Sequence, residues 1–162
     1  MSYIEPSQVA ALLSNPSERS TFLVIDVRSS DFAGGNLPGA INLTTDQFSS
    51  SAKVARVIEQ YLEPRTPKLE TVIVHCMRSQ TRGPYVAHIL AQSSKLPRNV
   101  EVKILRGGFQ GWYRTYKGRK ELFENLDTDE DNGVWEQVVE ADEGDEAEAQ
   151  DSRDLRQKLE RQ

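Results

Sequence analysis

One short segment of the 162-residue chain brings together side chains that can perform a reaction. His75 and Cys76 are followed, after five intervening residues, by Arg82, Gly83 and Pro84. A cysteine thiolate is a nucleophile, and a guanidinium can bind two oxygens of a phosphate-like anion side by side. The spacing Cys-x5-Arg therefore predicts that Cys76 attacks a tetrahedral oxyanion held by Arg82.

This segment lies where a buried strand is predicted to end and a helix to begin. Residues 71–74 form an apolar run, and Gly83-Pro84 suits a first helical turn. Ligands of parallel sheets bind beyond the carboxyl ends of the strands, where a helix N-terminus adds N–H donors. These donors and Arg82 favour the thiolate form of Cys76. An isolated cysteine after a strand is more often a small buried hydrophobe, but the agreement of strand, loop and helix favours the nucleophile.

The elements that must position this loop alternate along the chain. Apolar runs predict strands around residues 3–4, 22–25, 40–43, 71–74 and 100–105. Helices are predicted from Pro6 and Gly83 onward and over 50–62 and 109–116. Strands alternating with helices predict an α/β fold with a central, mainly parallel five-stranded sheet and helices on both faces.

Charge divides the chain in two. Residues 1–120 carry 16 basic and 9 acidic side chains, a net charge of +7, whereas residues 121–162 carry 4 and 16, a net charge of -12. Residues 127–150 contain 11 acids and no Lys or Arg. We therefore expect a catalytic domain over 1–126 and an acidic, largely flexible extension over 127–162, of which the region around Trp135 is the part that can pack on the domain.

The remaining composition excludes several classes of protein. The single Cys excludes a disulfide scaffold, and two His leave little for metal binding. No apolar run reaches the roughly 20 residues of a membrane span, and the N-terminus lacks the pattern of a signal peptide. We expect a cytoplasmic protein, with the nucleus left open, that needs no cofactor or metal and binds neither nucleic acid nor membrane. The oligomeric state stays open.

Three further segments resemble the rhodanese fold. Residues 25–28, Ile-Asp-Val-Arg, are similar to the Asp-Val-Arg motif that follows its first core strand. Residues 35–42 resemble its Gly-His-Ile-Pro-Gly-Ala-x-Asn turn, with Asn36 where His is usual, and residues 102–112 resemble its final strand, double Gly and Trp-bearing helix. The resemblance covers about residues 3–116.

The length of the cysteine loop subdivides this family. Sulfurtransferase rhodaneses have four residues between Cys and Arg, whereas five, in the form His-Cys-x5-Arg-Gly-Pro, resembles the M-phase inducer dual-specificity phosphatases and the related eukaryotic arsenate reductases. The resemblance implies that Cys76 is the nucleophile and Arg82 the oxyanion binder. It implies a bowl lined by Met77, Arg78, Ser79, Gln80 and Thr81, with support from His75, Asp26, Arg28 and Gly83.

This chain departs from those relatives in two respects. Residues 77–81 include no acid, so any general acid must come from elsewhere or the leaving group must need none. Gly83 stands where many cysteine phosphatases have Ser or Thr, which predicts modest turnover of aryl phosphates. Arg78 is read as a solvated side chain in preference to a rim residue that attracts anions.

The leading functional prediction is a cysteine-dependent protein phosphatase that acts on phosphotyrosine through a phosphocysteine, with Ser and Thr substrates left open. The second is arsenate reduction. Because Cys76 is the only cysteine, glutathione and glutaredoxin would then have to be partners. Thiosulfate sulfurtransfer and a non-catalytic rhodanese binding module remain as further alternatives. The substrate is accordingly a phosphoprotein or a small oxyanion.

Overall fold

The computed structural model describes residues 2–127, which form a five-stranded sheet with the order β1-β5-β4-β2-β3. The strands are β1 (Ser2–Ile4), β2 (Phe22–Asp26), β3 (Ile41–Asn42), β4 (Thr71–His75) and β5 (Glu101–Leu105). Each neighbouring pair is parallel. The predicted α/β fold with a five-stranded parallel sheet is confirmed.

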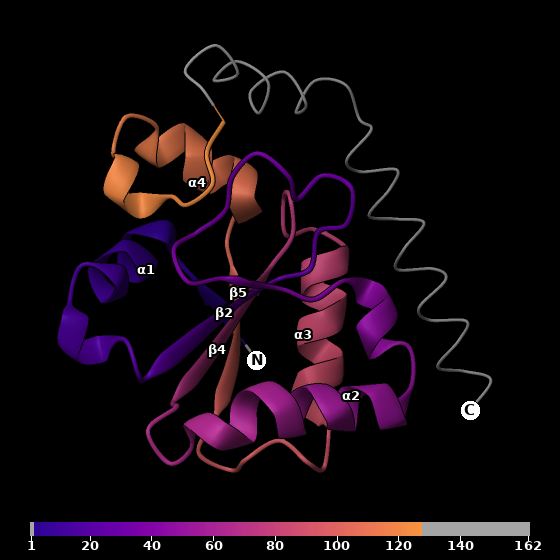
Figure 1. The fold of residues 1–162 in the computed structure, drawn as a ribbon. Helices are drawn as coiled ribbons and strands as arrows, with labels where there is room; N and C mark the ends of the chain where they lie inside the picture. The colour runs from indigo at the N-terminus through magenta and orange to yellow at the C-terminus, as the bar shows by residue number, and fades with distance from the viewer. Residues whose placement is uncertain (1, 128–162) are drawn as a thin grey trace.

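Within residues 2–127, four α-helices cover the two faces of this sheet. They are α1 (Pro6–Leu13), α2 (Ser51–Val57), α3 (Arg82–Gln92) and α4 (Gly108–Tyr116). Figure 1 shows α1 and α4 on one side of the strands and α2 and α3 on the other. Short 3₁₀ turns span Pro16–Glu18, Thr45–Phe48, Glu63–Arg65 and Lys120–Leu122.

The helix predicted over residues 50–62 differs from the observed one. The observed segment is α-helical over Ser51–Val57 and continues as a wider π-helical turn over Ile58–Leu62. Both Ile58 and Leu62 are fully buried in this arrangement, so the wider turn keeps the predicted apolar stripe on the sheet.

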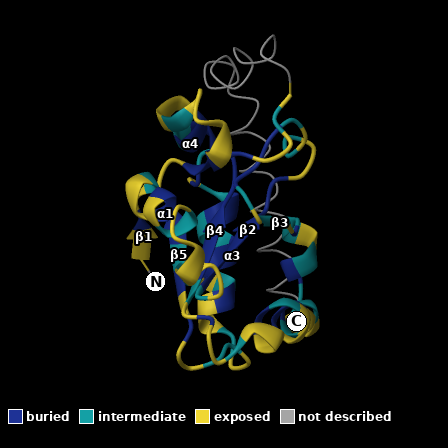
Figure 2. Ribbon diagram, turned by 60° about the vertical axis from the view of Figure 1, so that its left-hand side comes forward, coloured by how far each residue is buried: buried dark blue, intermediate teal, exposed yellow. Residues whose placement is uncertain are grey.

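Two apolar clusters, one on each face of the sheet, form the core. In β2, Leu23 and Ile25 point into the cluster under α2 and α3, whereas Phe22 and Val24 point into the cluster under α1 and α4. This alternation follows from the two-residue period of a strand and explains why a strand covered on both faces reads as a continuous apolar run. β2 is accordingly buried throughout, and β4 is buried from Val72 onward (Figure 2).

The end of the described chain folds back onto the domain. Asn36 and Glu124 form an antiparallel bridge, and the Trp112 indole N–H donates to the carbonyl oxygen of Leu122 at 2.9 Å. Leu122 and Phe123 are buried in the cluster under α4. The predicted packing around Trp135 lies outside the described residues. Within residues 2–127, no helix has the length and apolar character needed to cross a bilayer.

Candidate active site

The loop between β4 and α3 places the thiol of Cys76 at the start of a helix. β4 ends at His75 and α3 begins at Arg82. Ser79 has the left-handed φ of 57°, which helps to turn the loop back toward the helix. The Cys76 Sγ accepts a hydrogen bond from the Gly83 backbone N–H at 3.3 Å. An N–H donor and the positive end of a helix both stabilise a thiolate at this position.

The first turn of α4 holds the same loop from behind. The backbone N–H groups of Phe109 and Gln110 donate to the carbonyl oxygens of Cys76 and Met77 at 3.0 and 2.9 Å. Gly108 has a φ of +60°, and a Cβ there would lie 2.6 Å from both carbonyl oxygens. The double glycine therefore does more than turn the chain, because the loop approaches α4 too closely for a side chain at position 108.

The predicted lining residues lie in different environments. The Met77 side chain packs in the apolar cluster under α4, so that only its backbone can face a ligand. Ser79 is buried, Arg78 and Thr81 are half-buried, and Gln80 is exposed. Arg78, expected to be a solvated surface side chain, is thus only partly exposed.

Neither of the two central residues is open to solvent. Cys76 and Arg82 are both fully buried.

Asp26 and Arg28, the predicted supporting pair, form a buried fork. The Arg28 Nε and Nη2 atoms donate to the Asp26 carboxylate, with the shortest contact at 2.7 Å, and both side chains are fully buried. Arg28 also donates to the carbonyl oxygens of Asp31 and Gly35 at 3.0 and 2.7 Å. The pair thereby fixes the backbone of the turn after β2.

His75 connects this pair to the cysteine loop. Its Nδ1 donates to the carbonyl oxygen of Cys76 at 2.9 Å, and its Nε2 lies 3.6 Å from the Asp26 carboxylate. The ring is fully buried, and Asp26 and His75 are register partners at the ends of β2 and β4. At this position the ring bonds to the backbone of the loop, and its supporting role stays a prediction.

Asp31 belongs to the site, although the sequence did not single it out. Its carboxylate accepts two hydrogen bonds from Arg82, Nη1 to Oδ1 at 3.0 Å and Nη2 to Oδ2 at 2.7 Å. Burial alone would raise the pKa of Asp31, but the hydrogen bonds and charge of Arg82, with the charge of Arg28, outweigh it and hold the pKa below the usual 3.8. Asp31 is therefore an ionised partner of Arg82 at neutral pH.

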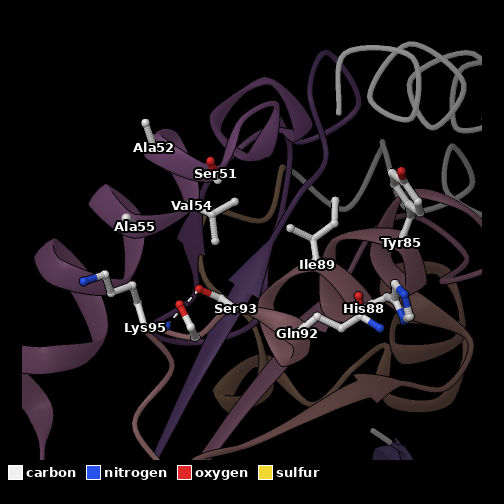
Figure 3. Close-up of a pocket in the computed structure, with 11 residues that line it drawn as sticks. Ser51, Ala52, Val54, Ala55, Tyr85, His88, Ile89, Gln92, Ser93 and Lys95 are labelled. Carbon is white, nitrogen blue, oxygen red and sulfur yellow. Dashed lines mark hydrogen bonds between the residues drawn. The ribbon is translucent and has the colours of Figure 1, made fainter. Parts of the chain in front are cut away.

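A separate hollow of about 730 Å³ lies between α2 and α3. Val54 and Ala55 of α2 and Ile89 of α3 contribute apolar surface, and Figure 3 shows their side chains with those of the polar residues around them. Tyr85, one helical turn after Arg82, lines the hollow at the end of α3 that is nearer the cysteine loop, and Lys95 lines it beyond the other end.

In this parallel α/β domain a cysteine directly follows a strand, and the next helix begins with a buried arginine. This arrangement defines a class of cysteine proteins that bind anions. Comparison with known families makes the assignment specific. The Rhodanese-like domain family matches residues 5–115, and the chain belongs to that family.

Named relatives divide between two activities. The dual specificity phosphatase ibp1 of Schizosaccharomyces pombe is 33% identical over 143 residues, which cover 76% of this chain and 96% of the relative. The structure of an As-Sb reductase from Leishmania major is 27% identical with a TM-score of 0.62, covering 86% and 98% of the two chains. These relatives support a cysteine-based enzyme that is either a phosphatase or an arsenate reductase.

A yeast structure supports the same fold. Ygr203w, described as a yeast protein tyrosine phosphatase of the rhodanese family, matches with a TM-score of 0.68 at 24% identity. The match covers 83% of this chain and 96% of that one.

Proposed function

We propose that this protein is a cysteine-dependent protein phosphatase that acts on phosphotyrosine through a phosphocysteine intermediate. The observation that carries the proposal is the placement of the Cys76 Sγ, which lies 3.3 Å from the Gly83 N–H at the N-terminus of the helix that Arg82 begins. This arrangement supplies a stabilised thiolate beside a cationic oxyanion binder.

The reaction runs in two displacements. The Cys76 thiolate attacks phosphorus, the Sγ–P bond forms, and the bond from phosphorus to the phenolic oxygen breaks. A water molecule then attacks the phosphocysteine, which releases inorganic phosphate and restores the thiolate. Arg82 and the loop N–H groups offset the negative charge on the phosphoryl oxygens in both steps.

The need to protonate the leaving group limits the range of good substrates. Asp31 is the acidic side chain that contacts Arg82, and its lowered pKa keeps it ionised, so it does not supply this proton. A phenol, with a pKa of about 10, leaves more easily without an acid than the more basic alkoxides of Ser and Thr do. The lower basicity of a phenolate therefore supports phosphotyrosine as the proposed substrate.

Hydrolysis of an aryl phosphate by the wild type and by Cys76→Ser tests the proposal. We expect turnover in the wild type, a phosphoenzyme that can be trapped by rapid acid quench, and loss of both in the variant. Turnover that persists in Cys76→Ser would contradict a cysteine nucleophile.

Arsenate reduction is the second candidate, favoured by the likeness to the Leishmania reductase. The Cys76 thiolate would attack arsenate and displace a hydroxide, which takes a proton from solvent. Glutathione would then attack the Cys76 sulfur, so that the S–As electron pair reduces As(V) to As(III) and a mixed disulfide forms. Glutaredoxin would reduce that disulfide, because Cys76 is the only cysteine of the chain.

The two activities can be measured on one preparation. With glutathione reductase present, consumption of NADPH that depends on arsenate, glutathione and glutaredoxin reports the reductase, and aryl phosphate hydrolysis reports the phosphatase. A thiosulfate:cyanide assay tests the sulfurtransferase alternative. If none of these reactions occurs while the protein still binds tungstate, the binding-module alternative gains support.

A further inference from the structure

Arg82 is held by Asp31 through the flat end of its guanidinium. The two contacts, at 3.0 and 2.7 Å, join Nη1 and Nη2 to the two carboxylate oxygens. Such a double contact fixes both the plane of the guanidinium and its rotation. Since an arginine has five N–H donors, a carboxylate that takes two at this end also determines where the Nε edge points.

The carboxylate is itself fixed by its surroundings. The Ser29 backbone N–H donates to the Asp31 Oδ1 at 3.1 Å, and Arg28 donates to the Asp31 carbonyl oxygen at 3.0 Å. Asp31 is thus held at both its side chain and its backbone. It therefore differs from a mobile carboxylate that contacts Arg82 only transiently.

Arg28, the source of one of these bonds, is anchored in turn. Its guanidinium is gripped by the buried Asp26 carboxylate and lies 4.1 Å from the ring centre of Phe109 and 5.3 Å from that of Phe32. Opposite charges therefore alternate from Asp26 through Arg28 and Asp31 to Arg82. Rigidity of the buried first pair is passed through the turn after β2 to the arginine of the cysteine loop.

We propose that Asp31 is the positioning residue of the site, which orients Arg82 to bind the oxyanion. The inference rests on the proposed function only in taking Arg82 as the oxyanion binder. Preorganisation of this kind raises affinity because the arginine does not lose rotational freedom when the ligand binds. Asp31 touches neither the nucleophile nor the bond that breaks.

The test compares Asp31→Asn with Asp31→Glu and with a matched control, Glu121→Gln. Glu121 is an exposed carboxylate that pairs with Arg119 at 2.9 Å, so its removal changes the net charge equally. Affinity for tungstate, read by protection of Cys76 from alkylation, is measured together with kcat and KM for an aryl phosphate.

We expect Asp31→Asn to weaken tungstate binding and lower kcat/KM by roughly 10- to 100-fold, because an amide cannot reproduce a charge-assisted double contact. Asp31→Glu, which keeps the charge but displaces it by one methylene, should give an intermediate affinity. Glu121→Gln should match the wild type. Equal or tighter tungstate binding by Asp31→Asn would overturn the inference and identify Asp31 as a competitor for the guanidinium.

Failure of this inference is distinguishable from failure of the proposed function. Tungstate affinity needs no turnover, so weakened binding in Asp31→Asn supports the positioning role even if no phosphate ester is hydrolysed. Normal hydrolysis with unchanged affinity overturns the role and leaves the phosphatase intact. If Asp31→Asn does not fold, Asp31→Glu decides, since wild-type affinity with a displaced carboxylate would overturn the role. A crystal structure of the folded variant in which the Arg82 guanidinium has not moved would overturn it as well.

Discussion

Two arginine–aspartate forks lie in this domain, and they use the same chemistry in different settings. Asp26 and Arg28 are two residues apart, and both side chains are completely buried. Asp31 and Arg82 are separated by 51 residues, and the Asp31 side chain keeps 22% of its surface exposed. In the first fork, Arg28 also donates to two backbone carbonyl oxygens. In the second fork, Arg82 is the first residue of α3, the helix whose Gly83 N–H donates to the thiol.

The difference indicates which property each fork serves. A fully buried charge that loses its partner has no access to water, so the first fork governs stability. In the second fork the Asp31 side chain is partly exposed and can be hydrated when Arg82 is replaced, so replacing Arg82 should be felt mainly in anion binding. Four experiments test this division, beginning with the largest expected effect.

Arg28→Leu should lower the free energy of unfolding by about 3–5 kcal/mol, because it leaves the Asp26 carboxylate buried without its fork. That loss is a large share of the stability of a typical domain. Urea denaturation measures it, with Arg106→Leu as control, since Arg106 forms an exposed pair with Glu5. A loss no greater than in the control would contradict the structural role of the first fork.

Arg82→Lys should lower kcat/KM for an aryl phosphate by about 100-fold, because an ammonium cannot make the double contacts of a guanidinium. The free energy of unfolding should fall less than in Arg28→Leu. Steady-state kinetics and denaturation of the same sample give both values, and the exposed Arg98→Lys is the control. Loss of stability without loss of kcat/KM would reverse the assignment of the two forks.

Phe109→Leu should lower the free energy of unfolding by about 1–2 kcal/mol, since it removes the ring that lies 4.1 Å from the Arg28 guanidinium. The bond from residue 109 to the Cys76 carbonyl uses the backbone and remains. The effect on kcat/KM should therefore be much smaller than that of Arg82→Lys. An effect on kcat/KM as large as that of Arg82→Lys would show that the first fork also controls the chemistry.

The smallest effect concerns acid. The pKa of Asp31 is lowered in the folded protein, so the ionised carboxylate stabilises the fold at a pH above 3.8, the usual pKa of this group. This stabilisation is lost as the pH falls through the lowered pKa. The stability difference between the wild type and Asp31→Asn should therefore shrink between about pH 5 and pH 3. Urea denaturation at both pH values measures it, and a constant difference would exclude a folded-state interaction of the carboxylate.

Local pattern predicts most of the fold, whereas a family resemblance marks the residues of the first fork but not their pairing. The apolar runs ending at Ile25 and Val74 predicted the central strands, because strands covered on both faces have no polar alternation. The resemblance of residues 25–28 to the Asp-Val-Arg motif marks Asp26 and Arg28, and the spacing within one loop marks Cys76 and Arg82.

The second fork could not be found in this way. Asp31 lies in a turn segment without periodicity, and the folded sheet alone brings it to a partner 51 residues away. The role of Gly108 also depends on the folded structure, because the sequence alone predicts only a turn at this position. Its close approach to the Cys76 carbonyl oxygen arises only when α4 packs against the loop.

The dependence of the loop on α4 has a consequence for synthesis. The carbonyl oxygens of Cys76 and Met77 accept hydrogen bonds from the backbone of residues 109 and 110, and β1 pairs with β5, about 100 residues later in the chain. A nascent chain that has been synthesised only as far as Cys76 therefore carries the thiol but cannot yet form the site. At roughly 5–20 residues per second, a ribosome needs a few seconds to add the segment through residue 110. During that interval Cys76 is an ordinary cysteine, and the loop gains its full set of bonds only once β5 and α4 have emerged.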